Sequence, residues 1–143
     1  MTVRVERTMT VAAPPERVWA FIADPDQRAR PISVVKDWEV HDDGRATWQI
    51  ELPIPIVDRT IAVETEDVEQ RENEYARFIG RSKVMRVQGE QELAPTDDGG
   101  TEVTNRFVVD GKLPGVERFF KRNLDGELRN LEQALSDYVE VEI

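Results

Sequence analysis

Two amide side chains lie within apolar strand patterns and are candidates for polar chemistry inside the protein. Asn105 alternates with Val103 and Phe107, and Gln91 precedes Leu93 by two residues. Because successive side chains of a strand point to opposite faces, both amides should face the core with their apolar neighbours. A buried amide needs a hydrogen-bond partner. Each could fix a carbonyl or hydroxyl group of a ligand, or could instead bond to a neighbouring strand or a buried water.

His41 is the only histidine of the chain and directly precedes a turn sequence, Asp42-Asp43-Gly44. An imidazole is the side chain that most readily exchanges a proton near neutral pH. A general base, however, also needs a place in a cavity and a group that orients it. His41 is therefore either an acid-base candidate, together with Gln91 and Asn105, or an exposed turn residue without a catalytic role.

A positive cluster stands out in an otherwise acidic chain, within "RFIGRSKVMR". Its members are Arg77, Arg81, Lys83 and Arg86. The cluster could hold an anionic head group at the mouth of a cavity. The alternative is pairing with acidic residues of neighbouring strands, since opposite charges across strands are common. The expected partners are Glu64, Glu66, Glu90 and Glu92.

Several kinds of chemistry lack the residues that they need. The chain has no cysteine and one histidine, so it has no thiolate nucleophile and no metal-ligand spacing. It also has no glycine-rich phosphate loop. We therefore expect neither a metal nor a cofactor. The net charge of −10 repels a phosphate backbone, which argues against a nucleic-acid partner. Abundant carboxylates with few lysines are typical of salt-loving organisms, although a soluble mesophilic protein can look the same.

The length of 143 residues predicts one domain, spanning 1–143. No apolar run approaches the roughly 18 residues of a membrane helix, so we expect no membrane span. The start, "MTVRVERTMTV", lacks the apolar block of a secretion signal. A cytoplasmic location is the resulting expectation.

The N-terminal part predicts a strand followed by a short helix. Residues 2–11 alternate as a half-solvated strand does. In "AAPPERVWAFIADPDQ", Pro14 and Pro15 suit the first turn of a helix of about ten residues, and Asp24-Pro25 should end it. The apolar face of this helix comprises Val18, Phe21 and Ile22. The next stretch, "DPDQRARPIS", is either a second short helix or a loop.

The middle of the chain predicts six strands in three hairpins. The strand pairs are 33–41 with 45–54, 59–70 with 75–83, and 84–93 with 101–111. Polar turn sequences separate the members of each pair. Pro53 and Pro55 cannot donate hydrogen bonds to a sheet, so we expect them to interrupt it.

The C-terminal part predicts one long amphipathic helix from Leu113 to about Tyr138. Apolar residues recur there at spacings of three and four. Gly126 lies inside this helix and costs about 1 kcal/mol relative to alanine. We therefore expect a bend or a close backbone approach near Gly126.

This order of elements resembles the helix-grip fold of the SRPBCC or START-like superfamily, which includes birch pollen allergens and polyketide cyclases. "VAAPPERVWAFIADPD" at 11–26 resembles the family's entry signature, and "GGTEVTNRF" at 99–107 is similar to its Gly-Thr start of the last strand. The chain is also similar to one class of carbon-monoxide-dehydrogenase subunits. "QRARPIS" departs from cyclase-like members, which often place an aromatic residue shortly after Asp-Pro. The implied fold is α+β, a curved antiparallel sheet of about seven strands around a long C-terminal helix, with one or two short helices after the first strand.

The resemblance implies a cavity between the sheet and the C-terminal helix. Taking the apolar phase of each strand as inward, the candidate lining is Trp48, Ile50, Phe78, Met85, Val87, Gln91, Val103, Asn105, Phe107, Phe120, Leu124 and Leu128. The same side chains could instead simply fill a core. A pocket of roughly 300 Å³ that exposes Asn105 would favour ligand binding.

Three functions follow from the resemblance. The first is binding or transport of a small hydrophobic molecule. The second is a polyketide cyclase/dehydrase-like enzyme. The third is an accessory module that binds another protein, for which a solid core would argue. Pairing of edge strands into a homodimer is also possible.

Overall fold

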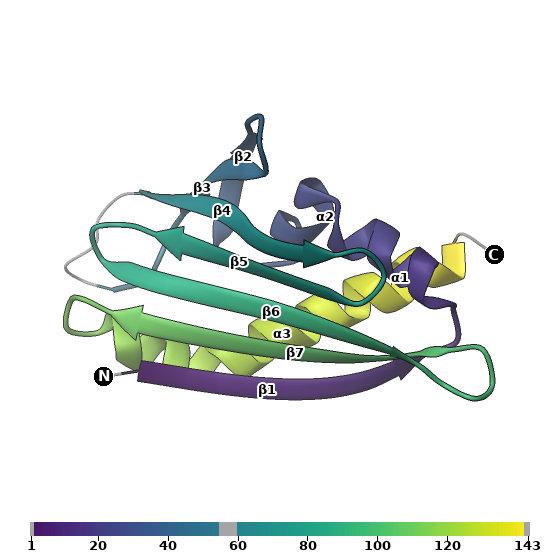
Figure 1. Ribbon diagram of the computed structural model, residues 1–143. Coiled ribbons are helices and arrows are strands. Elements are labelled where there is room, and N and C mark those ends of the chain that lie inside the picture. The colour runs from purple at the N-terminus through teal and green to yellow at the C-terminus, as the bar shows by residue number, and fades with distance from the viewer. Residues whose placement is uncertain (1, 55–59, 142–143) are drawn as a thin grey trace.

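The computed structural model describes residues 2–54 and 60–141. Its elements in chain order are β1 (Thr2–Val11), α1 (Pro15–Ile22), α2 (Pro25–Ala29), β2 (Val35–Val40), β3 (Arg45–Ile50), β4 (Ile61–Arg71), β5 (Tyr75–Arg81), β6 (Met85–Pro95), β7 (Thr101–Gly111) and α3 (Val116–Val141). The seven strands form one antiparallel sheet in the order β1-β7-β6-β5-β4-β3-β2, and α3 lies along one face of it (Figure 1). The predicted α+β helix-grip fold is confirmed.

The three predicted hairpins are present, and their turns contain residues that tolerate a positive φ. Asp43 and Gly44 have φ of 64° and 72° between β2 and β3, and Asn73 has φ of 66° between β4 and β5. Short polar side chains and glycine adopt this left-handed backbone most easily. Pro53 lies after the end of β3, outside any strand, as expected. Pro55 lies outside the described residues.

The Asp24-Pro25 dipeptide both ends one helix and begins another. α1 has eight residues and ends at Ile22, two fewer than predicted. The Asp24 carboxylate then accepts a hydrogen bond of 2.9 Å from the Asp26 backbone N–H, which caps α2, and Pro25 occupies the first turn. The second short segment is therefore a helix over Pro25–Ala29, followed by a loop.

The long helix differs from its prediction at the start and at its glycine. It begins at Val116, because Gly115 has φ of +94°, a conformation outside the helical region. Leu113, the predicted first residue, is left exposed. A Cβ placed on Gly126 would meet no atom within 4 Å, so the expected close backbone approach is absent there.

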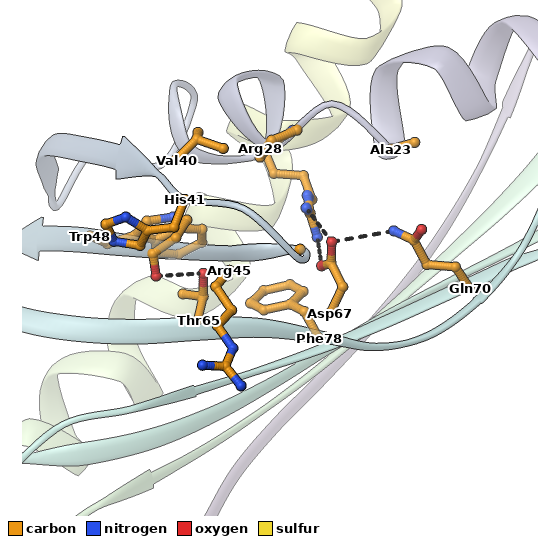
Figure 2. Close-up of a pocket in the computed structure, with 13 residues that line it drawn as sticks. Ala23, Arg28, Val40, His41, Arg45, Trp48, Thr65, Asp67, Gln70 and Phe78 are labelled. Carbon is orange, nitrogen blue, oxygen red and sulfur yellow. Dashed lines mark hydrogen bonds and ion pairs between the residues drawn. The ribbon is translucent and has the colours of Figure 1, made fainter.

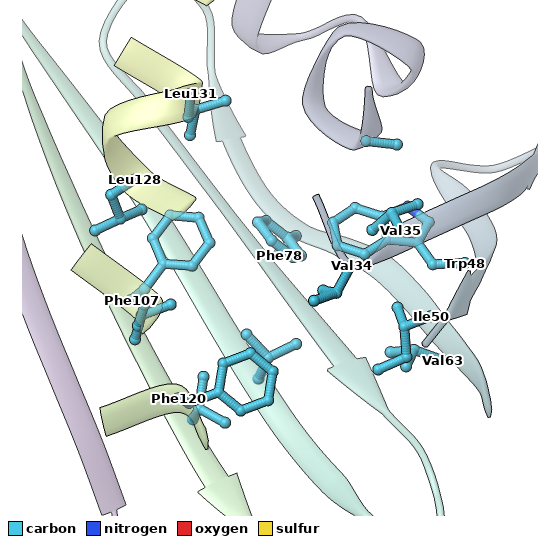
Figure 3. Packing of buried hydrophobic residues seen from close by; sticks show 14 of the residues in the cluster. Val34, Val35, Trp48, Ile50, Val63, Phe78, Phe107, Phe120, Leu128 and Leu131 are labelled. Carbon is cyan, nitrogen blue, oxygen red and sulfur yellow. The ribbon is translucent and has the colours of Figure 1, made fainter. Parts of the chain in front are cut away.

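The core lies between the sheet and α3, and it contains all twelve candidate residues in buried positions. Aromatic rings from three strands meet at its centre. Phe78 of β5 packs against Trp48 of β3 and Phe107 of β7, with ring centroids 5.8 and 5.9 Å apart. Figure 3 shows these rings beside Phe120 and Leu128 of α3. The inward phase predicted for the strands is thus correct.

Ion pairs fix α3 to the edge of the sheet. Arg7 of β1 donates to Glu132 at 3.1 Å and to Asp125 at 3.0 Å. The hydrogen bonds to Glu132 and then to Asp125 raise the pKa of the Arg7 guanidinium. The helix is therefore held in register along β1 by directional contacts in addition to apolar packing.

Candidate functional site

An apolar cavity of about 40 Å³ lies beneath α3. It is lined by Ile32, Val34, Trp48, Ile50, Phe78, Met85, Val87, Phe107, Val109, Phe120, Leu124, Glu127, Leu128 and Leu131. Among these described residues, no polar atom is exposed to the cavity. The Glu127 carboxylate accepts hydrogen bonds from the Ser33 backbone N–H, at 2.7 Å, and from the Ser33 hydroxyl. It thereby ties the loop after α2, which carries Ile32 and Val34, to the helix.

A larger and more polar cleft opens between the short helices and strands β3 and β4, with a volume of about 310 Å³. Figure 2 shows Arg28 of α2 facing Asp67 of β4 across it. The two guanidinium nitrogens Nη1 and Nη2 lie 2.5 and 3.1 Å from the two carboxylate oxygens, a bidentate geometry. Arg28 also lies over the ring of Phe78, 5.7 Å from its centroid. The cleft therefore has an aromatic floor and a charged wall.

Trp48 and Phe78 separate the cleft from the apolar cavity, because both residues line both spaces. They come from β3 and β5, on either side of β4. Rotation of these two rings would join the two spaces. The polar cleft and the apolar cavity are thus neighbouring compartments divided by aromatic side chains.

A third space, of about 10 Å³, is small and partly polar. Its lining comprises Phe21, Ile22, Arg28, Gln91, Val103, Asn105, Leu131, Glu132 and Leu135. Gln91 and Asn105 are direct cross-strand neighbours on β6 and β7, and each is only 3% exposed. Gln91 Oε1 and Arg28 Nε are buried without a hydrogen-bond partner among the described residues. Such atoms are rare in folded proteins and call for an explanation.

The predicted lining is thus divided between two spaces. Gln91, Val103 and Asn105 line the small polar cavity, and the other nine predicted residues line the apolar one. The expectation of one pocket of about 300 Å³ that exposes Asn105 was wrong, because Phe78, Trp48 and the helix side chains fill most of the space.

Sequence reasoning missed two groups of lining residues. Ile32 and Val34 lie in a loop without strand or helix periodicity, so no pattern marked them. Arg28 and Asp67 are charged residues on a very short helix and on a strand with a register shift between Asp67 and Glu69. A bulge of this kind re-aims side chains, and no sequence signal disclosed it.

His41 lies at the edge of the cleft, away from the two amides. Its Nε2 is 2.8 Å from the Thr47 hydroxyl, and its Nδ1 is 3.3 Å from a carboxylate oxygen of Glu39. The three acid-base candidates therefore do not converge: His41 borders the cleft, whereas Gln91 and Asn105 border the small polar cavity.

The positive cluster lies away from the cleft and the apolar cavity, since none of its four residues lines either space. Arg77 pairs across strands with Glu69, at 3.8 Å, and not with any of the four expected glutamates. Arg81 lies opposite Glu64 on one side and Arg86 on the other. Within the described ranges, no three His, Asp or Glu side chains gather as metal ligands would.

Known structures share this fold over nearly the whole chain. A conserved protein from Geobacillus kaustophilus has a TM-score of 0.79 at 13% identity, covering 96% of this chain and 95% of that one. A START superfamily protein from Mycobacterium smegmatis has a TM-score of 0.76 at 18% identity, covering 98% and 99%. The Zhui aromatase/cyclase from Streptomyces sp. R1128 has a TM-score of 0.69 at 15% identity, covering 99% and 93%. At these identities the likeness shows a common fold.

No curated protein matches the sequence. None of the helices in the described part of the chain combines the length and hydropathy that crossing a membrane requires. The family model described as polyketide cyclase / dehydrase and lipid transport matches residues 2–136. With that match, the strand order and the long helix packed on the sheet, the chain belongs to the polyketide cyclase / dehydrase and lipid transport family.

Proposed function

We propose that the protein binds a small hydrophobic molecule in the space between the sheet and α3, and that the cleft is the entrance. The observation that carries this proposal is the wholly apolar surface of the inner cavity beside a larger polar cleft. Binding sites for small molecules are mostly apolar with a few placed polar groups. This pair of spaces offers both kinds of surface.

The volumes indicate how a ligand would enter. The inner cavity, at about 40 Å³, is too small for a typical ligand, whereas the cleft, at about 310 Å³, reaches the lower end of the range for ligand pockets. Trp48 and Phe78 form the wall between them. We infer that an incoming ligand displaces these rings and places its apolar part beneath α3, where burial is worth about 25 cal/mol per Å².

The test is a titration with N-phenyl-1-naphthylamine, an apolar dye that fluoresces when shielded from water. Val87 lines the inner cavity, so Val87→Leu and Val87→Phe should weaken binding in order of added volume. Val108, on neighbouring β7, is part-buried and lines neither space, so Val108→Leu and Val108→Phe are the matched controls. Circular dichroism verifies that each variant is folded.

Saturable binding by the wild type, weakened at position 87 and retained at position 108, would support the proposal. No saturable dye binding by the wild type would contradict it. Equal weakening at positions 87 and 108 would also contradict it, because it would place the dye outside the inner cavity.

A further inference from the structure

We propose that the small polar cavity formed by Arg28, Gln91 and Asn105 is the subsite that recognises a hydroxyl group of the ligand. This inference rests on the proposed ligand-binding function and specifies the chemical class of the ligand: an apolar molecule that carries a hydroxyl. It follows from the two buried atoms that have no partner, Gln91 Oε1 and Arg28 Nε. One is a hydrogen-bond acceptor and the other a donor.

The two residues contribute to the same cavity of about 10 Å³, which is close to the space that one water-sized group needs. A hydroxyl oxygen can accept from the Arg28 guanidinium and donate its proton to the Gln91 carbonyl. A ketone could only accept, which leaves the Gln91 carbonyl unsatisfied. An ammonium group could only donate, and it would meet the positive charge of Arg28.

A carboxylate also fits poorly. Its oxygens would face the Gln91 carbonyl oxygen, and the carboxylate of Glu132 is part of the same lining. The charge of Arg28 is already matched by Asp67 in a bidentate pair, so Arg28 has little call for a second anion. A neutral hydroxyl therefore suits the subsite best, and the adjoining amide of Asn105 adds a further donor and acceptor.

The subsite adjoins the apolar cavity. Leu131 of α3 lines both spaces, and Phe78, which lines the apolar cavity, lies beneath the Arg28 guanidinium. A ligand whose apolar body lies beneath α3 can thus direct a hydroxyl past Leu131 toward the two amides. The same displacement of Phe78 that admits the body would open this route.

The test compares 2-naphthol with 2-methylnaphthalene, which has nearly the same shape and a methyl in place of the hydroxyl. Gln91→Leu should weaken binding of 2-naphthol by about tenfold, the effect of one to two hydrogen bonds, and leave binding of 2-methylnaphthalene unchanged. Gln88→Leu, three residues earlier on β6 and not part of the cavity lining, is the control and should change neither affinity.

Two further measurements separate recognition from a structural role. The side-chain amide NMR signals of Gln91 and Asn105 in the wild type should shift with 2-naphthol and stay in place with 2-methylnaphthalene. Gln91→Leu should unfold at no lower urea concentration than the wild type without ligand, because Oε1 has no partner to lose. A structural amide, bonded to a fixed water, would instead make this variant less stable.

The outcomes distinguish this inference from the proposed function. If neither naphthalene binds the wild type, both are refuted for this ligand class. If both bind, but Gln91→Leu weakens them equally or not at all, hydroxyl recognition is overturned and apolar binding stands. The same holds if the two amide signals do not respond to 2-naphthol, a result that needs no variant to fold.

Discussion

Replacing Gly89 by alanine should destabilise the protein, because this glycine makes room for the aromatic wall. Gly89 lies on β6 directly between Phe78 of β5 and Phe107 of β7. A Cβ at position 89 would lie 2.3 Å from Cε1 and 2.8 Å from Cζ of Phe78, and 3.0 Å from Cζ of Phe107. All three distances are far shorter than the separation of about 3.5–4.0 Å at which carbon atoms pack well. The rings must therefore move.

The expected cost follows from the burial of the ring that must move first. Phe78 is 2% exposed and packs against Trp48 and Phe107, so its displacement disturbs two neighbours. Overpacking of this kind costs about 1–3 kcal/mol. Alanine gains about 0.5–1 kcal/mol over glycine from the unfolded state, which offsets part of that cost. We expect a net loss of about 1–2 kcal/mol for Gly89→Ala.

Urea unfolding followed by circular dichroism measures this loss as a lower midpoint with an unchanged slope. Gly126→Ala is the matched control, since no atom lies within 4 Å of its added Cβ, and it should raise the free energy of unfolding by about 0.5–1 kcal/mol. If both variants are stabilised alike, Phe78 yields without cost and the reasoning about a packed aromatic wall is refuted.

Three other substitutions test contacts elsewhere in the structure by the same urea assay. Ser33→Ala removes the hydroxyl donor to Glu127 and should cost about 2 kcal/mol, so an unchanged midpoint would contradict a loop held by this bond. Thr101→Val leaves the backbone carbonyl two residues before α1 without its 2.7 Å hydrogen bond and should cost about 1–3 kcal/mol; a neutral result would mean that another donor replaces it. Burial and then the hydrogen bond to Glu90 raise the pKa of Tyr75 to about 12, so its contribution to stability is complete below pH 10 and is lost as the pH rises toward 12. Tyr75→Phe should therefore lose stability less steeply than the wild type between pH 10 and 12, and equal slopes would argue against this role.

Strand patterns were predictable because each strand follows the same two-residue alternation over most of its length. In β7, Val103, Asn105 and Phe107 point inward as the sequence indicates, and Gln91 faces Asn105 across the strand pair. The burial of both amides followed from this phase alone. Their lack of protein partners did not, since it depends on the side chains opposite them.

Boundaries and volumes were less predictable, for identifiable physical reasons. Asp24-Pro25 is a strong signal to end a helix, but the same carboxylate and ring also favour the start of the next one. Leu113 fits the apolar spacing of α3, yet the backbone at Gly115 prevents the helix from beginning there. The cavity volume depends on how Ile32 and other loop residues close over the core, and periodicity carries no information about that packing.

The shared wall of Trp48 and Phe78 has a consequence for how such a protein could diversify. Neither ring contributes a side-chain hydrogen bond or ion pair among the described contacts, and strand pairing depends only on their backbones. Exchanging either ring for a smaller or larger one would transfer space between the polar cleft and the apolar cavity. Two codons could thus retune the size and polarity of the accepted molecule, while the scaffold around them stays as it is.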